Sequence, residues 1–510
     1  MDLDLQARSR ARLARDPRFD GKFYIGVITT GVYCRPICRA RTSKESNVRY
    51  FPTAAAAAEA GFRPCLRCRP ESSPGTAAWF GTRNTVSRAL RLIEEAGLED
   101  DRVETLAQRL GIGSRHLRRL FLRHLGATPA AVMQTRRLHF AKKLIDETNL
   151  PMTEIAMAAG FGSVRRFNAA IRKTYQRTPT QIRRLAISPE LVRENEYVFR
   201  LSYRPPYNWK ALLSYLARHA APGLEAVEDN KYRRTISLNG APGYIEVAFR
   251  PESDELILRT QFGDSRRLFA IVERVRGMFD LNADWSVIAA TLSHDPMLRP
   301  IIENSPGVRV PGCWDGFELT TRAILRQQVS VAAATTMVSR IARAFGRAVP
   351  FGEKLNRLFP TPQDLADADF SRKGIGLPKA RLASIQALAR SVCRGEISFE
   401  QFNDPEILLK KLLDIPGIGN GTVQYVAMRV LREPDAFPPE NLGWIRALGL
   451  RKAADLEDRS RAWRPWRSYA AMHLWNMANE RTEPAKGGEQ FSRTRWDEEQ
   501  RDEPSASIVT

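Results

Sequence analysis

The sequence has no run of about 18 apolar residues, the length that a membrane-spanning helix needs, and no leader of the secretory type. It contains only six cysteines in 510 residues, and four of them lie in one short segment. This distribution excludes an extensive disulfide framework and favours a reducing compartment. We therefore expect a soluble, cytoplasmic protein that does not bind a membrane.

Acidic side chains are scarce relative to basic ones. The chain has 57 Asp and Glu against 79 Lys and Arg, which gives a formal net charge of +22. An excess of this size indicates a polyanionic partner such as DNA. At 510 residues the chain is also too long for a single core, so three or four domains are expected.

Two close cysteine pairs lie near the N-terminus, Cys34-x3-Cys38 and Cys65-x2-Cys68. Each pair can bind one side of a tetrahedral Zn2+, and thiolate sulfur is a preferred zinc ligand. The spacing predicts one zinc ion held by all four cysteines. A purely structural zinc knot and four unrelated buried thiols are the alternatives that spacing alone leaves open.

The residues around these cysteines carry a stronger signal. Phe23–Arg41, Asn47–Thr53 and Gly61–Pro70 together resemble the N-terminal domain of the Ada methyl-phosphotriester repair proteins, over about residues 17–71. The resemblance implies that Cys34 takes a methyl group from a damaged DNA phosphate while bound to zinc. Methylation would move the charge of the site from about −2 to −1, so the methylated form should bind DNA more tightly. The arginines expected to meet the DNA backbone are Arg35, Arg39, Arg41, Arg63, Arg67 and Arg69.

A repeated helical pattern follows. Apolar residues recur at helical spacing before Gly111–Gly113, and Ser114 is then expected to cap a second helix. The same arrangement recurs from Thr153 to Phe161, with Ser163 as the expected cap. Such a pair predicts two helix-turn-helix units, each with one helix suited to the major groove of DNA.

This pair of units resembles the DNA-binding domain of the AraC transcription activators, over about residues 84–185. The resemblance implies that helices 114–125 and 163–174 enter successive major grooves. The candidate DNA contacts are Arg115, Arg118, Arg165 and Arg166. Each of these is more often a phosphate contact or a solvated side chain than a base reader. We also expect His116 to be a surface residue, because it has no metal-ligand partner nearby.

Residues 197–260 alternate apolar and polar side chains, which predicts a small antiparallel sheet. From about Phe279 to Met477 the pattern is helical again. The expected strands are Tyr197–Tyr203, Arg233–Asn239, Tyr244–Arg250 and Glu255–Thr260.

Leu413–Gly421 reads as a helix-hairpin-helix motif, in which Gly417, Gly419 and Gly421 let backbone N–H groups approach a DNA phosphate. With the surrounding motifs it resembles DNA-3-methyladenine glycosylase II, the AlkA type, over about residues 196–480. The motifs are Val310–Glu318, Arg322–Ser330, Tyr425–Arg429 and Trp463–Tyr469.

That family flips a damaged base out of the duplex and cleaves its N-glycosidic bond. The resemblance assigns Tyr425, Trp466 and, less directly, Trp463 to the base pocket, where aromatic rings can hold a cationic base. Aromatic side chains are equally often simply core residues. Gln328 matches the residue that fills the gap left in the duplex.

Three positions depart from the glycosylase pattern. The essential aspartate of the family aligns with Asn441, which lacks the negative charge that stabilises an oxocarbenium-like sugar. We expect the neighbouring Glu440 to point elsewhere. The pocket tryptophan, or the lysine of lyase-competent relatives, aligns with Gly421, so no lyase step is expected. Arg326 stands where the family usually has glycine.

The sequence therefore predicts a multidomain α+β protein for DNA alkylation repair and its regulation. It would excise alkylated bases of the 3-methyladenine type, with Cys34 as a stoichiometric methyl acceptor. Double-stranded DNA is the expected partner, and RNA polymerase is a further candidate. The alternatives are a methylation-switched regulator whose glycosylase half is weak or inactive and a DNA-binding scaffold with neither chemistry. Cys313 and Cys393 lack the motif of a second alkyl acceptor.

The expected domains are a zinc domain (1–75), an all-α double helix-turn-helix domain (84–185), a small antiparallel sheet domain (196–300), an all-α helix-hairpin-helix glycosylase domain (301–480) and a disordered tail (481–510).

Overall fold

A computed structural model shows how these segments fold. It describes residues 4–74, 85–95, 103–186, 193–370, 376, 378–399, 405–439, 444–445 and 448–482. Asn441, Glu440 and all of the predicted tail except residues 481–482 lie outside the described residues. Among the residues that the structure describes, no helix combines the length and the apolar character that crossing a membrane requires.

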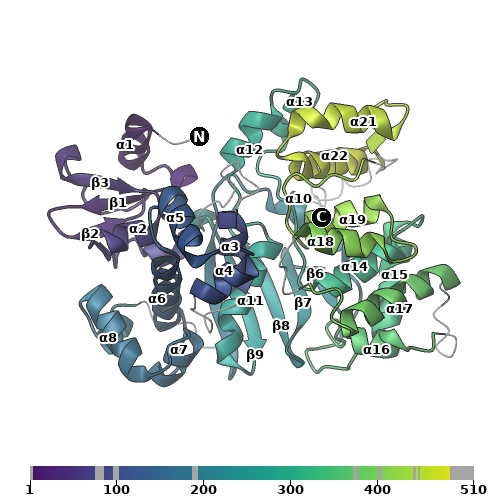
Figure 1. Ribbon diagram of the computed structural model, residues 1–510, viewed down its shortest axis with the longest axis horizontal. Coiled ribbons are helices and arrows are strands. Elements are labelled where there is room, and N and C mark those ends of the chain that lie inside the picture. The colour runs from purple at the N-terminus through teal and green to yellow at the C-terminus, as the bar shows by residue number, and fades with distance from the viewer. Residues whose placement is uncertain are drawn as a thin grey trace, which may run out of the picture.

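The N-terminal part is a small sheet with helices on it (Figure 1). Its strands lie in the order β3-β1-β2-β4, with β1 antiparallel to β2 and β3 and with β2 parallel to β4. Thr53 caps α2 by accepting a hydrogen bond from the Ala56 N–H at 3.0 Å. The elements are α1 (Leu5–Ala14), β1 (Tyr24–Val27), β2 (Val32–Cys34), β3 (Val48–Phe51), α2 (Ala54–Glu59) and β4 (Arg63–Pro64).

Two helix-turn-helix units follow, joined by the long helix α6. In the second unit the Ser163 hydroxyl accepts from the Arg166 N–H at 3.2 Å, which confirms the predicted cap. In the first unit Gly113 is the N-cap and Ser114 is the first helical residue, so the predicted Ser114 cap is wrong. The elements are α3 (Thr85–Glu95), α4 (Val103–Arg109), α5 (Ser114–Leu125), α6 (Pro129–Glu147), α7 (Met152–Ala158), α8 (Val164–Tyr175) and α9 (Pro179–Leu185).

A five-stranded antiparallel sheet occupies the middle of the molecule, in the order β5-β9-β8-β7-β6. The four predicted strands are present, and β6 is an additional short strand. Asn239 and Gly240, both at positive φ, turn the chain from β7 into β8. The elements are β5 (Glu196–Ser202), α10 (Trp209–His219), β6 (Glu225–Glu228), β7 (Lys231–Leu238), β8 (Ala241–Arg250), β9 (Glu255–Phe262) and α11 (Leu268–Met278).

Helices make up the C-terminal part, to the right of the sheet in Figure 1. They are α12 (Trp285–Leu292), α13 (Leu298–Asn304), α14 (Gly316–Leu325), α15 (Val331–Phe345), α16 (Pro362–Ala366), α17 (Lys379–Cys393), α18 (Pro405–Leu413), α19 (Asn420–Arg429), α21 (Ala453–Ser460) and α22 (Arg467–Thr482). Together these parts confirm the predicted mixed α+β class.

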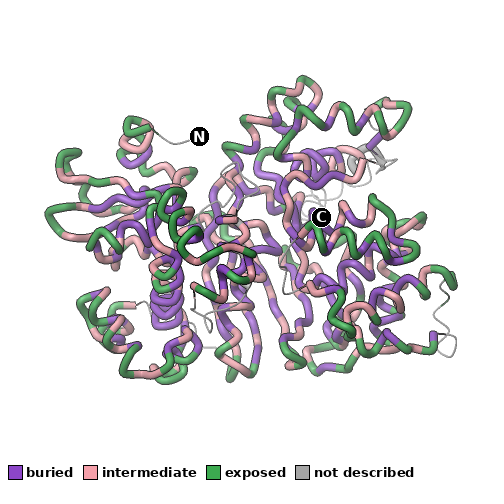
Figure 2. The backbone as a smooth tube through the Cα atoms, viewed as in Figure 1, coloured by how far each residue is buried: buried purple, intermediate pink, exposed green. Residues whose placement is uncertain are grey.

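The buried core divides along helix α6. One cluster of buried apolar residues runs from Tyr24 to Met133, and another runs from Leu138 to Leu474. The first helix-turn-helix unit thus shares a core with the N-terminal sheet, and the second shares one with the central sheet. Figure 2 shows α6 as a largely buried helix between them.

A buried arginine connects the N-terminal part to the C-terminal half. Arg204, which is almost fully buried, donates to the carbonyl oxygens of Asp20 and Asn282, each at 2.8 Å. Nearby, Lys22 forms an ion pair with Asp284 at 2.7 Å. Because the charge of Arg204 is buried, its carbonyl partners fix the relative position of the two parts.

Candidate functional sites: a metal centre and a base pocket

The four cysteines converge at one edge of the N-terminal sheet. Cys34 ends β2, where it pairs with Ile25 of β1. The Cys65 N–H donates to the Tyr33 carbonyl at 3.0 Å, which brings the second cysteine pair beside the first. The four Sγ atoms all lie within 4.8 Å of one another.

This arrangement fits zinc. A tetrahedral ion with Zn–S bonds of about 2.3 Å places its sulfurs roughly 4 Å apart. All four residues are half-buried as whole residues, and the Cys68 Sγ accepts a hydrogen bond from the Arg35 N–H at 3.3 Å. The donor set is therefore that of a single four-thiolate zinc ion.

Five of the six arginines near the cysteines fall into two groups, and the sixth, Arg63, is half-buried in β4. Arg35 is buried and forms a close ion pair with Asp20, while its Nη1 donates to the Cys68 carbonyl at 3.2 Å. Arg69 pairs with Asp146 at 2.9 Å and with Glu147 at 3.1 Å, both on α6. These two are structural in this arrangement, contrary to the expectation that they meet DNA. The exposed members of the set are Arg39, Arg41 and Arg67.

The four predicted DNA-contact arginines of the helix-turn-helix units all lie on the surface of the protein. Arg115 and Arg118 are exposed on α5, and Arg165 and Arg166 are exposed on α8. The opposite sides of these helices carry buried apolar residues, so the basic side faces solvent. His116 is exposed, and its Nδ1 accepts a hydrogen bond from Arg119 Nη2 at 3.0 Å.

The helix-hairpin-helix is formed by α18, residues 414–419 and α19. Gly417 has a φ of +86°, and a Cβ there would lie 2.3 Å from the Ser384 Oγ. The Ser384 hydroxyl donates to the Pro416 carbonyl at 2.6 Å, which fixes the hairpin against α17. Gly419 is exposed with open space around it, and Gly421 is the second residue of α19.

The turn between α14 and α15 lies against this hairpin. Gln327 Nε2 donates to the Gly417 carbonyl at 2.8 Å and to the Thr422 Oγ1 at 3.1 Å. Its neighbour Gln328 is exposed at a φ of +57°. The predicted wedge residue and the predicted phosphate site therefore share one surface. Gln327 escaped the sequence analysis because its role depends on this long-range contact.

Tyr425 lies in a cavity of about 50 Å³ between α10, α14, α15 and α19. Its hydroxyl accepts from Arg326 Nη1 at 2.9 Å and from Arg429 Nη1 at 2.7 Å, and lies 3.0 Å from the Tyr215 hydroxyl. Burial would raise the pKa of Tyr425, but the charges of Arg429 and Arg326 outweigh it and lower that pKa.

The two predicted tryptophans lie elsewhere among the described residues. Trp463 is fully buried, donates its indole N–H to Asp295 at 2.7 Å and packs edge-on against Phe437. Trp466 is also buried and packs against Tyr469. Neither lines the cavity around Tyr425. Tyr215 and His219 of α10 line it instead, and Trp475 of α22 packs edge-on against both.

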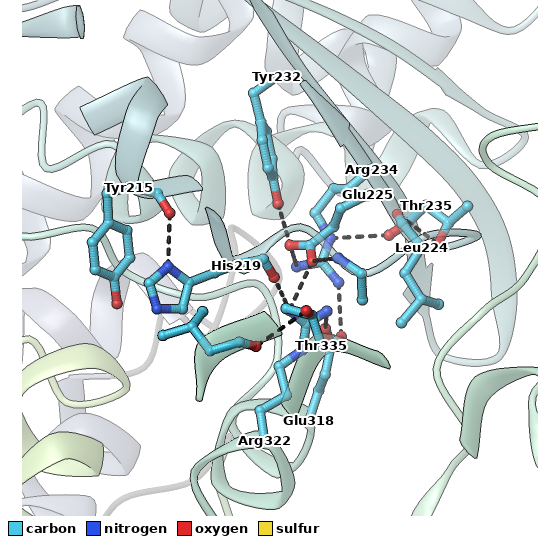
Figure 3. Close-up of polar contacts among 12 residues, drawn as sticks. Tyr215, His219, Leu224, Glu225, Tyr232, Arg234, Thr235, Glu318, Arg322 and Thr335 are labelled. Carbon is cyan, nitrogen blue, oxygen red and sulfur yellow. Dashed lines mark hydrogen bonds and ion pairs between the residues drawn. The ribbon is translucent and has the colours of Figure 1, made fainter. Parts of the chain in front are cut away.

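A buried ion cluster forms one wall of this cavity (Figure 3). Glu318 pairs with Arg234 at 2.7 Å and with Arg322 at 2.6 Å. Glu225 pairs with Arg322 at 2.7 Å and accepts from the Tyr232 hydroxyl at 2.6 Å. Burial alone would raise the pKa of the Glu225 carboxyl, but Arg322 and Arg234 hold it at about 2. The cluster therefore stays ionised and joins β6, β7 and α14.

Four family models match successive parts of the chain. Residues 7–71 match the metal binding domain of Ada, and residues 106–185 match a helix-turn-helix domain. Residues 198–315 match the AlkA N-terminal domain, and residues 321–461 match the HhH-GPD superfamily of base excision DNA repair proteins.

Curated relatives match either most of the chain or one part of it. A "Probable bifunctional transcriptional activator/DNA repair enzyme AlkA" from Mycobacterium tuberculosis is 39% identical over 92% of this chain and 96% of its own length. The Escherichia coli DNA-3-methyladenine glycosylase 2 is 31% identical over 54% of this chain and 96% of its own length. The Escherichia coli Ada enzyme is 35% identical over 34% of this chain and 48% of its own length.

The fold of the C-terminal half has a counterpart among solved structures. A 3-methyladenine DNA glycosylase from Archaeoglobus fulgidus superposes with a TM-score of 0.50 at 20% identity, over 56% of this chain and 99% of its own.

The chain belongs to the family of bifunctional transcriptional activator/DNA repair enzymes that join an Ada-type metal-binding domain and a helix-turn-helix domain to an AlkA-type glycosylase. It acts on DNA in alkylation repair and its regulation, it has a DNA glycosylase domain, and its four N-terminal cysteines form the site for one Zn2+.

Proposed function

We propose that Cys34 is the methyl acceptor of this protein and that its methylation switches the helix-turn-helix half to tight promoter binding. The convergence of four sulfurs within 4.8 Å at a partly exposed sheet edge carries this proposal. The exposed Arg39, Arg41 and Arg67 supply positive charge beside the site and can hold a DNA backbone there.

The transfer is a single displacement. The Cys34 sulfur attacks the methyl carbon of a DNA phosphotriester, an S–C bond forms as the C–O bond breaks, and a phosphodiester anion leaves. Bound zinc keeps all four sulfurs deprotonated at neutral pH. The thioether product does not turn over, so each chain acts once.

The regulatory step follows from charge. Loss of one negative charge at the metal centre weakens its repulsion of DNA phosphates. In the proposed complex α5 and α8 occupy successive major grooves, with Arg115, Arg118, Arg165 and Arg166 as contacts. RNA polymerase is the proposed partner of the promoter-bound form.

For the glycosylase half we propose that the hairpin with Gly417, Gly419 and Gly421 binds a DNA phosphate while Gln328 fills the gap left by the flipped base. The shared surface of Gln327, Gln328 and the hairpin supports this role. Tyr425 lines the proposed base pocket, and in the sequence Asn441 aligns with the family's charge-stabilising carboxylate. Trp466 packs against Tyr469 outside the cavity and is not part of the proposed pocket.

A second candidate is that the glycosylase half binds damaged bases but releases them slowly. Asn441 motivates it, because a neutral amide cannot replace a carboxylate. Losing one preorganised electrostatic group of this kind slows chemistry on the order of 10²–10³-fold.

The direct test of the acceptor is mass spectrometry after incubation with DNA that carries methyl phosphotriesters. We expect one added methyl group per chain, located on the peptide that contains Cys34. A methyl group on Cys38, Cys65 or Cys68, or none on any cysteine, would refute the assignment. A footprint of the promoter before and after methylation tests the switch, and equal affinities would contradict it.

A further inference from the structure

The guanidinium of Arg326 lies over the Tyr425 ring, which lines the proposed base pocket, and over the Trp475 ring beside it. Its central carbon lies 4.9 Å from the centre of the Tyr425 ring and 5.1 Å from the centre of the Trp475 ring. These are cation–π distances, so the pocket already holds a cation where a positively charged base would stack.

The charges around the cavity are not balanced. Arg234 and Arg322 are neutralised by Glu225 and Glu318. Within the described residues, Arg326 and Arg429 have no carboxylate partner. Arg429 donates instead to the Gly312 carbonyl at 3.0 Å and to the Tyr425 hydroxyl at 2.7 Å. The cavity is lined by four arginines and three carboxylates, the third carboxylate being Asp315, so its wall carries an excess of one positive charge.

The cavity also contains one hydrogen-bond acceptor, on His219, in addition to the arginine donors. His219 stacks on Tyr215 with ring centroids 4.2 Å apart, and its Nδ1 lies 2.7 Å from the Tyr215 carbonyl, an acceptor only. Nδ1 thus carries the proton, and burial together with Arg326 lowers the pKa of His219 to about 3. Its Nε2 is buried without a hydrogen-bond partner in the described part of the chain.

We propose that Arg326 is a specificity-determining residue, which directs the pocket to uncharged alkylated bases with a hydrogen-bond acceptor edge and against cationic ring-alkylated purines. An etheno-adenine is a base of the favoured class, and N7-methylguanine is one of the disfavoured class. This inference rests on the proposed base pocket and deepens it.

The physical reason is that a cationic base competes with Arg326 for the same ring faces and is repelled by it. A neutral base can accept a hydrogen bond from the guanidinium and stack on the exposed part of it. An unscreened unit charge at this range in a partly buried site changes affinity on the order of tenfold or more.

The test measures binding to two matched duplexes, one with etheno-adenine and one with N7-methylguanine, both on 2′-fluoro sugars that resist cleavage. Wild type should prefer the etheno duplex by about tenfold or more. Arg326→Gln should bring the ratio of the two affinities close to one. Arg326→Lys, which keeps the charge, should retain the bias against N7-methylguanine.

Arg343→Gln is the matched control, because it removes one positive charge from an exposed position of α15. It should leave the ratio at the wild-type value. Equal affinities in wild type, or the same ratio in Arg326→Gln as in Arg343→Gln, would overturn the proposal. A melting curve and binding to undamaged DNA verify that each variant is folded.

Base release from cleavable versions of the same duplexes separates this inference from the proposed glycosylase chemistry. Selective binding with no release from either duplex would mean that the chemistry fails while the specificity holds. Release of both bases with equal affinities for the two duplexes would mean that the specificity proposal fails while the glycosylase chemistry holds.

Discussion

The metal centre takes all four ligands from residues 34–68, whereas the side chains around Tyr425 come from α10, α14, α19 and α22. The first site has the proposed nucleophile at a half-buried sheet edge and exposed arginines beside it. The second has an arginine stacked on its own aromatic rings. The comparison sets a proposed acceptor site, whose four sulfur ligands are all in place, against a proposed base pocket in which an arginine covers the aromatic rings.

The largest difference between the sites should appear when Cys34 is changed. Cys34→Ser should abolish methyl transfer, because the nucleophile is lost, while base release by the C-terminal half stays at its wild-type rate. Methyl uptake and base release measured on one DNA sample test both statements. A matched Cys393→Ser variant, at an exposed position far from the centre, should behave as wild type. Loss of both activities in Cys34→Ser would contradict the claim that the two sites act separately.

The next largest effect should come from breaking the buried ion pair between Arg35 and Asp20, next to the proposed acceptor. Asp20→Ala leaves the Arg35 guanidinium buried without a carboxylate, which costs about 3–5 kcal/mol of folding free energy. We expect a lower denaturation midpoint and faster loss of zinc to a chelator. The exposed pair of Arg390 and Asp367 is the control, and Asp367→Ala should change stability by under about 1 kcal/mol. Equal effects of the two substitutions would contradict the structural role of Arg35.

Acid should destabilise the base-pocket half through Glu225. The pKa of its carboxyl is about 2 in the folded chain and 4.5 when unperturbed. The stabilisation is therefore complete above pH 4.5 and is lost as the pH falls toward 2, on the order of 3 kcal/mol in all. Denaturation midpoints across this pH range should show the loss in wild type and in the exposed-site variant Glu303→Gln. Glu225→Gln should lack that component, and an unchanged pH profile in it would refute the account.

The smallest effects should come from single arginines on α5 and α8. Removing one phosphate contact, as in Arg118→Ala or Arg165→Ala, should lower the slope of log affinity against log salt by about one. Promoter binding at several salt concentrations measures this slope. Arg343→Ala, on the exposed side of α15 in the other half, should leave it unchanged. If the slope is unchanged in both helix variants, then Arg118 and Arg165 make no phosphate contact, and α5 and α8 do not form the DNA interface.

The metal centre is built from nearby residues and the pocket from distant ones, and this difference also explains what the sequence could predict. The cysteine spacing, the two helical repeats and the Pro-Gly-Ile-Gly hairpin are local patterns, and the structure contains the cluster, the helices and the hairpin they indicate. Strand β6 was missed because its four residues, Glu225–Glu228, begin and end with glutamate.

The pocket was harder to predict because its members meet only in the folded chain. Tyr215, His219 and Trp475 are separated by up to 260 residues from one another, and no local pattern marks them. Trp463 was placed in the pocket by resemblance, but its indole N–H is committed to Asp295. Likewise, nothing local distinguishes the buried Arg35 and Arg69 from the exposed Arg39 and Arg67.

The most direct test of the contrast between the halves is single-turnover base release from methylated duplex DNA, with wild type beside Asn441→Asp. Restoring the carboxylate should accelerate release by on the order of 10²–10³-fold, while methyl transfer to Cys34 on the same DNA stays unchanged. Equal release rates for the two proteins would contradict the account, because the second site would then be as complete as the first.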